Sequence, residues 1–207
     1  MGIENCTAVE CDKLFESRRS IRFYTDQIVS KDMIEHLLGL AATAPSVMNI
    51  QPWRFTVVQG DKREGILGSM RQSCKYIDEA VGLLEPEDKQ ALQSDSHTSK
   101  EKIMEFYETL GRASAIIAVT MKKVDNKALR RQMLVSCGAA VQNLMLAANC
   151  YGLGTCCVGF ALWVEEKILQ DLGSLDSELV TIIALGYPAE HPNPATQKKV
   201  TIDWIGP

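Results

Sequence analysis

Apolar positions along the chain follow two spacings, and each spacing predicts one kind of secondary structure. Apolar side chains that recur every three or four residues predict amphipathic helices, over residues 9–16, 31–44, 62–84 (one or two helices), 103–110, 127–151 and 164–172. Short runs of β-branched and other apolar residues predict buried strands, over residues 54–59, 115–119, 155–158 and 179–186. Ser30 is the expected N-cap of the second helix, and Pro45 is expected to end that helix near residue 44.

The longest predicted helix, residues 127–151, is apolar nearly all round and contains the small residues Gly138, Ala139 and Ala140. Such a helix packs closely against other elements, so it is either a central helix or a dimer interface. Gly152 is the expected residue just after its C-terminus.

Two segments lack a clear pattern. Residues 85–100 are polar, and we interpret them as a surface insertion or lid within one domain. Residues 188–207 form a C-terminal extension with apolar residues near its end, which we expect to dock on something, such as a second subunit. No internal repeat occurs, so we predict a single domain over residues 1–207 or one protomer of an intertwined dimer.

Composition narrows the function classes. The formal net charge is -4, so nucleic acid is not an expected partner. No apolar run approaches the roughly 20 residues that span a bilayer, and no signal peptide begins the chain. We therefore expect a cytoplasmic protein with no membrane partner. The seven cysteines include no CxxC spacing, which predicts reduced thiols and no metal site. Cys156 and Cys157 are either a redox pair or two small residues of a buried strand.

Three arginines and two serines lie within residues 17–22. Guanidinium groups beside hydroxyls suit a phosphate or another planar anion, although such a run alone is more often a solvated basic turn. A second polar group is the loop 44–53, which carries Ser46, Asn49 and Gln51 between two prolines. It is either a rigid connection or a clamp for the edge of a heterocycle.

The glycine-rich run at residues 152–159 has the spacing G-x-G-x4-G and follows a helix, so it is not a dinucleotide-binding motif. We expect its strand to end at Gly159, where the backbone can be approached closely. No nucleophile elbow, P-loop or metallopeptidase motif occurs. With Lys198 and Lys199, the polar groups predict a phosphorylated, planar ligand that supplies the chemistry as a cofactor.

The order of these segments resembles the FMN-dependent nitroreductase family. The resemblance rests on SRRSIRF at residues 17–23, on APS and NIQPWRF within residues 44–55, on GLGTCCVG at residues 152–159 and on LGYPAE at residues 185–190. It implies an α+β three-layer sandwich, with a mostly antiparallel central sheet flanked by helices. It also implies an interlocked homodimer whose C-terminal extensions cross to the partner and whose two FMN molecules lie at the interface.

The resemblance implies a role for each site residue. Arg18 and Ser20 would hold the FMN phosphate with Arg19 beside them, and Arg22 would lie near the pyrimidine edge, where negative charge develops on reduction. The remaining implied contacts are Pro45, Ser46, Val47, Asn49 and Gln51 toward the flavin of the other subunit, the backbone of Val158 and Gly159 at the reactive N5, and Lys198 or Lys199 at the phosphate. No counterpart is evident in residues 62–112 for the family's mid-chain flavin contact.

The leading hypothesis is an oxidoreductase in which NADH or NADPH reduces FMN and is then replaced by a nitroaromatic, quinone or similar acceptor, in ping-pong order. A second hypothesis is a reductase of the same family for another substrate, by dehalogenation or enone reduction. A third is a flavin-binding module without turnover. A small nucleic-acid-binding protein fits the net charge poorly.

Overall fold

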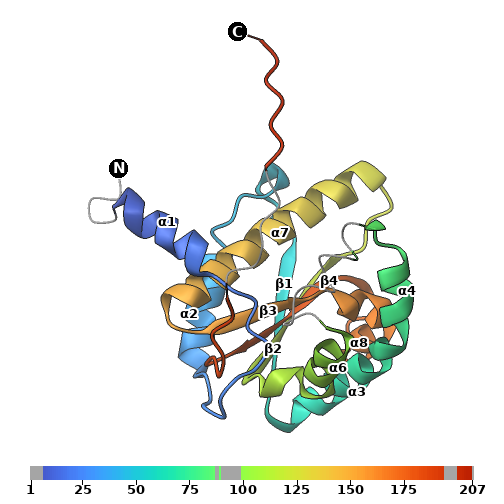
Figure 1. The fold of residues 1–207 in the computed structure, drawn as a ribbon. Helices are drawn as coiled ribbons and strands as arrows, with labels where there is room; N and C mark the ends of the chain where they lie inside the picture. The colour runs from blue at the N-terminus through green and yellow to red at the C-terminus, as the bar shows by residue number, and fades with distance from the viewer. Residues whose placement is uncertain (1–6, 87–88, 90–98, 194–199, 207) are drawn as a thin grey trace.

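The structure, a computed structural model, describes residues 7–86, 89, 99–193 and 200–206. Its α-helices are α1 (Ala8–Ser17), α2 (Lys31–Ala41), α3 (Arg63–Ser73), α4 (Ile77–Gly82), α6 (Lys100–Thr109), α7 (Lys127–Cys150) and α8 (Glu165–Asp171). Its strands are β1 (Trp53–Gln59), β2 (Ala115–Lys122), β3 (Gly154–Val158) and β4 (Ser177–Gly186). Every predicted strand and helix is present, and Figure 1 shows their arrangement.

The boundaries differ from the predictions in three places. The range 62–84 contains two helices, α3 and α4, separated by the 3₁₀ turn η3 (Cys74–Tyr76). The helix expected to reach residue 44 ends at Ala41, because the chain tightens into a turn in which the Ala44 N–H bonds the Ala41 carbonyl at 3.2 Å. α8 begins after a second 3₁₀ turn, η5 (Gly159–Val164), and α6 begins at Lys100, inside the segment expected to be a lid.

The four strands form one antiparallel sheet in the order β1-β2-β4-β3. Ile117 of β2 lies opposite Val57 of β1 on one side and Ile183 of β4 on the other. Both β2 and β4 lie in the middle of the sheet, and they are buried along almost their whole length. The predicted mostly antiparallel sheet is confirmed.

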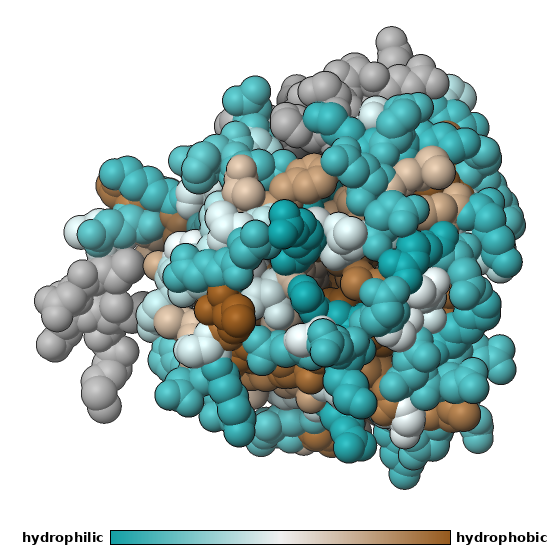
Figure 2. Space-filling model, turned by 90° about the horizontal axis from the view of Figure 1, so that it is seen from below, coloured by the Kyte–Doolittle hydropathy of each residue, from teal (hydrophilic) through white to brown (hydrophobic). Residues whose placement is uncertain are grey.

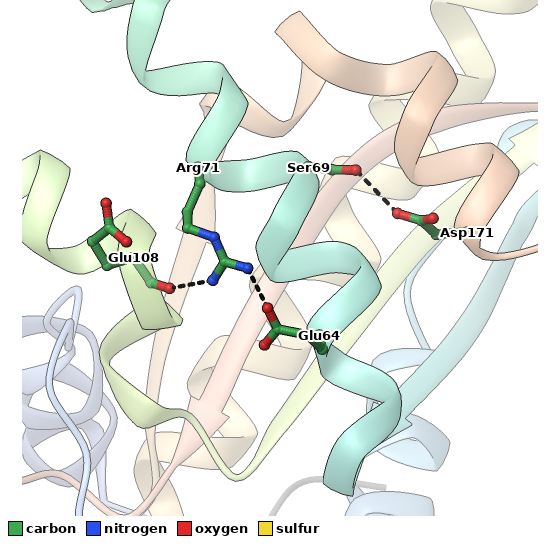
Figure 3. A network of polar contacts seen from close by, with 5 residues as sticks. All are labelled: Glu64, Ser69, Arg71, Glu108 and Asp171. Atoms are coloured by element: carbon green, nitrogen blue, oxygen red, sulfur yellow. Dashed lines mark hydrogen bonds and ion pairs between the residues drawn. The ribbon is translucent and has the colours of Figure 1, made fainter.

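Helices cover both faces of this sheet, which confirms the three-layer sandwich (Figure 1). Because side chains alternate along a strand, Ile116 packs with α3, α6 and α8 while its neighbour Ile117 packs with α2 and α7. On the first side, a polar network joins the helices (Figure 3). Arg71 of α3 pairs with Glu64 and donates to the Glu108 carbonyl of α6 at 3.0 Å.

The long helix α7 begins at the predicted position and ends at Cys150. Gly152 has φ +69, and the Leu153 N–H bonds the Ala148 carbonyl at 2.9 Å, which closes the helix with the expected glycine. By length and composition alone α7 could cross a membrane, contrary to our expectation, but its inner face packs on the sheet. The predicted close packing through small residues is present at Ala140, which is buried. It is absent at Gly138, where an added Cβ would have no atom of the described residues within 4 Å.

The outer face of α7 and the chain's last described segment expose apolar side chains. Val135 of α7 is 75% exposed. Residues 200–206 extend away from the body in Figure 1, and Trp204 is 88% exposed. Seen from below, by contrast, the surface is mostly hydrophilic with apolar side chains showing between the polar ones (Figure 2). Apolar surface available for a partner therefore includes α7 and the C-terminal segment.

Candidate functional site

The arginine-containing segment, residues 17–25, lies beside the edge strand β3 and the residues that follow β4. Ser20 forms a parallel bridge with Thr155 of β3, and the Ile21 N–H bonds the Thr155 carbonyl at 2.9 Å. The Tyr24 N–H bonds the Gly111 carbonyl at 3.0 Å, and the Thr25 N–H bonds the Tyr187 carbonyl at 2.9 Å. Segments far apart in the sequence thus fix the path of residues 20–25.

Glycines allow this close path. An ideal Cβ on Gly154 would lie 2.7 Å from the Cβ of Ile21, so any larger residue would displace the segment. Gly111 has φ +63, and a Cβ there would overlap the carbonyl of Arg22. The glycine-rich run was expected to allow a close approach at Gly159. The contact within the described chain is made at Gly154, while Gly159 is exposed and has no atom within 4 Å of an added Cβ.

The buried side chain of Tyr24 links the arginine-containing segment to β4. Its hydroxyl lies within hydrogen-bond distance of the Ile21 and Ala184 carbonyl oxygens. The ring is buried, and burial raises the pKa of Tyr24 well above its ordinary value, so the hydroxyl keeps its proton. Contacts within the chain itself therefore fix the path of residues 20–25.

The side chains of this segment divide into two groups. Arg19 turns back on α1, where it donates to the Arg18 carbonyl at 2.8 Å and reaches the Glu16 carbonyl, a stabilising contact at a helix C-terminus. The side chains of Arg18, Ser20 and Arg22 are half-buried, and in the described ranges none of them has a hydrogen-bond or ion-pair partner. The Nε of Arg19 is also buried, with no hydrogen-bond partner among the residues that the structure describes. Half-buried cations that are not engaged in an ion pair fit an anionic ligand.

Cys156 of β3 faces this cationic group. Burial raises the pKa of the Cys156 thiol to about 11, and the positive charges of Arg22 and Arg18 act in the opposite direction. Cys157 points to the other face of the strand, where its Sγ lies 3.2 Å from the Thr181 hydroxyl. Adjacent strand residues point in opposite directions, and both thiols are free. This geometry favours the interpretation of Cys156 and Cys157 as two small residues of a strand over the interpretation as a redox pair.

The loop after α2 forms the second polar group. The Ser46 hydroxyl accepts from the Gln51 N–H at 3.0 Å, and the Gln51 amide donates to Asn49 Oδ1 at 3.3 Å. Met48, Asn49 and Gln51 have φ of 47, 53 and 48, a backbone region that costs of order 1–3 kcal/mol per non-glycine residue. Pro45 is exposed and Val47 is half-buried. Ser46, Asn49 and Gln51 are thus joined by hydrogen bonds within this loop, and part of the loop has strained backbone.

One chain does not bring the two polar groups together. The Asn149 amide of α7 donates to the Ser17 hydroxyl at 2.8 Å, beside the arginines. The Val47 N–H donates to the Ser136 hydroxyl of α7 at 3.1 Å, beside the amide loop. Asn149 and Ser136 are 13 residues apart in this helix, a separation of about 20 Å along its axis. Val158, in contrast, is the last residue of the strand that pairs with Ser20, and Gly159 follows directly after it. Lys198 and Lys199 lie outside the described residues.

A group of aromatic side chains that sequence reasoning missed lies next to Gly159. Trp163 stacks on Tyr76 with ring centroids 5.4 Å apart and lies 6.2 Å from Phe160. Tyr107 lies 5.7 Å from Phe160. The positive charge of Arg22 acts on the Tyr107 hydroxyl, although burial dominates and raises the pKa of Tyr107. Tyr76, Tyr107, Phe160 and Trp163 therefore form one aromatic cluster, to which the middle of the chain contributes Tyr76 and Tyr107.

Comparison with known proteins identifies the family. The sequence model described as "Nitroreductase family" matches residues 15–187. The chain belongs to the nitroreductase family. A relative from Archaeoglobus fulgidus, described as a candidate NADH dehydrogenase/NAD(P)H nitroreductase, is 31% identical over 184 residues, covering 87% of each chain.

Solved structures confirm the nitroreductase fold. The FMN-dependent nitroreductase of Mycobacterium smegmatis, in complex with NADPH, matches with a TM-score of 0.70 and 19% identity, covering 92% of this chain and 98% of its own. An oxidized iodotyrosine deiodinase bound to FMN and 3-iodo-L-tyrosine matches with a TM-score of 0.72 and 22% identity, covering 94% and 98%. The same fold therefore occurs with different substrates.

Proposed function

We propose that this nitroreductase-family chain is an FMN-dependent oxidoreductase. It would take reducing equivalents from NADH or NADPH and pass them to a nitroaromatic, quinone or similar acceptor in ping-pong order. The observation that carries the proposal is the set of half-buried Arg18, Ser20 and Arg22 side chains, which have no partner in the described part of the chain. Charge-assisted bonds from these groups suit a phosphate and an electron-rich ring edge.

FMN, when bound, supplies the transfer of a hydride equivalent. In our proposal Arg18 and Ser20 bind the phosphate, and Arg19 supports them by fixing the end of α1. Arg22 would place a fixed positive charge at the pyrimidine edge of the flavin, where negative charge develops on reduction. Because that positive charge is already in position, it would stabilise the negative charge with no rearrangement of the site. The exposed backbone at Gly159, with that of Val158, is proposed to face N5. Lys198 or Lys199 is proposed to complete the phosphate site.

We infer that two copies of the chain build each site. The separation of about 20 Å along α7 between the amide loop and the arginines supports this, because both groups carry side chains suited to one planar ligand. In this arrangement Pro45, Ser46, Val47, Asn49 and Gln51 come from the partner. The exposed apolar side chains of Val135 and Trp204 support a homodimer with α7 and the C-terminal extension at its interface. The free cysteines of the described ranges support a cytoplasmic location.

The experiment is an anaerobic spectral titration of the FMN-loaded protein. Bleaching of the flavin absorbance by NADH or NADPH, followed by recovery on adding a nitroaromatic or quinone, is the expected result. Protein that does not retain FMN after reconstitution would contradict the proposal. Flavin that binds but is bleached by neither nucleotide would favour the binding module without turnover.

A second candidate is reductive dehalogenation, which the fold match to the iodotyrosine deiodinase favours. The same titration separates the two. A reduced protein that is reoxidised by a halogenated aromatic with release of halide, and not by nitroaromatics or quinones, would support this candidate.

A further inference from the structure

Glu190 makes contacts that the site described above does not yet explain. It lies four residues after the end of β4 and is half-buried. Its Oε1 accepts from the Arg22 N–H at 2.5 Å and from the Phe23 N–H at 3.2 Å. In the opposite direction, the Ala189 N–H donates to the Phe23 carbonyl at 2.9 Å. The two segments are more than 160 residues apart in sequence, so these bonds are purely tertiary.

These bonds complete the backbone of the arginine-containing segment. Three of its five successive N–H groups, those of Ile21, Tyr24 and Thr25, donate to backbone carbonyls. The other two belong to Arg22 and Phe23, and a single carboxylate satisfies both. Buried or half-buried N–H groups are costly when unpaired. Glu190 is therefore the side chain that fixes the main chain at Arg22.

The carboxylate does this without pairing with the guanidinium. Glu190 and Arg22 act with opposite sign on the pKa of Cys156 and on that of Tyr24, so both charges face the same buried groups. In the described part of the chain, however, no ion pair joins the two side chains. The shared oxygen is engaged by main-chain N–H groups, which leaves the guanidinium available to a ligand.

We propose that Glu190 is a positioning residue, whose carboxylate fixes the backbone of Arg22 and so aims the Arg22 guanidinium at the anion bound in this site. The inference rests on the proposed flavin site for its consequence, but its structural part can be tested without flavin. A preorganised cation costs less to order on binding than a mobile one. Loss of the carboxylate is expected to weaken binding through Arg22 although Glu190 does not touch the ligand.

The test compares three variants of the full chain. Glu190→Ala removes both hydrogen bonds, and Glu190→Gln keeps an oxygen acceptor but loses the charge. Glu105→Ala is the control, because Glu105 is an exposed residue of α6. Amide hydrogen exchange of the FMN-free proteins is measured over residues 18–25 by mass spectrometry. Affinity for FMN and the midpoint potential of bound FMN are then measured for each variant.

We expect faster exchange at Arg22 and Phe23 in E190A, by about tenfold or more, since hydrogen bonds to a charged acceptor are strong. E190Q should show a smaller increase, and E105A should match the wild type. FMN affinity should fall in the same order. If E190A does not fold, the increase in E190Q over E105A carries the same test.

The outcomes separate the inference from the proposed function. Unchanged exchange at Arg22 and Phe23 would overturn the inference. Faster exchange with unaltered FMN affinity and potential would overturn the positioning role, and so would equal losses in E190A and E190Q, which would assign the effect to charge alone. A wild type that does not bind FMN would contradict the proposed function, while the exchange measurement would still decide whether Glu190 holds the segment.

Discussion

Gly154→Ala should destabilise the protein, because the added methyl group has no room. The ideal Cβ would lie 2.7 Å from the Cβ of Ile21 and 2.8 Å from each of its γ carbons. The Ile21 side chain is β-branched, so it has few alternative rotamers and cannot swing away. The main chain of residues 20–22 must move instead, and these residues carry the site.

Overpacking of this kind costs about 1–3 kcal/mol. For a chain of this size the melting temperature should fall by roughly 2–12 °C. The matched control is Gly39→Ala in α2, an exposed position where an added Cβ meets no atom of the described residues within 4 Å. A glycine in a helix interior is less favourable than alanine, so Gly39→Ala should raise stability by about 0.5–1 kcal/mol.

The assay is thermal and urea unfolding of both variants and the wild type, with and without FMN. The two substitutions are chemically identical, so opposite signs would show that the close contact at Ile21 decides the result. The reasoning would be refuted if Gly154→Ala melted at or above the wild-type temperature. The FMN-free measurement keeps this test independent of the proposed function.

Three further predictions concern FMN binding, the loss of stability at alkaline pH and the dimer interface. Arg18→Ala should weaken FMN retention by about tenfold or more, whereas Arg22→Ala should mainly slow reduction by NAD(P)H. Equal loss of FMN with normal reduction after reconstitution would disprove that division of roles. Burial raises the pKa of Cys156 and of Cys137 from 9.0 to about 11. As the pH rises, the thiols of the unfolded chain ionise before those of the folded chain, so the stabilisation from keeping the thiols protonated is complete below pH 9 and is lost as the pH rises to 11. Urea unfolding across that range should show a falling free energy of unfolding. In Cys137→Ala this fall should be smaller. Trp204→Ala should shift the protein toward monomer in sedimentation velocity, and an unchanged dimer would argue against a role for the C-terminal segment.

Local patterns predicted the secondary structure well. The alternation of Ile116 and Ile117 between the two cores follows from strand geometry alone. Ser30 caps α2 through a bond to the Met33 N–H at 3.2 Å, as its residue type predicts. These features depend on neighbours within a few residues, so the sequence carries their signal directly.

The site was predicted less completely, because its contacts join distant segments. The run at residues 17–23 was found by its composition, but nothing in it shows that Gly111 and Gly154 make room for it. In the sequence Glu190 is only the last residue of LGYPAE, because its two hydrogen bonds to residues 22 and 23 produce no periodic pattern that would predict them. The left-handed backbone at Met48 is likewise unexpected for its residue type and follows from tertiary context.

The spacing of the two polar groups along α7 has a genetic consequence. In the proposed two-chain site, a copy defective in the arginine segment and a copy defective in the amide loop are each inactive as homodimers. In a heterodimer of the two, one site is built from the defective arginine segment and the defective amide loop, while the other site is built from the two intact segments. Two inactive parents would then give an active hybrid, and an excess of either parent would dilute that activity away.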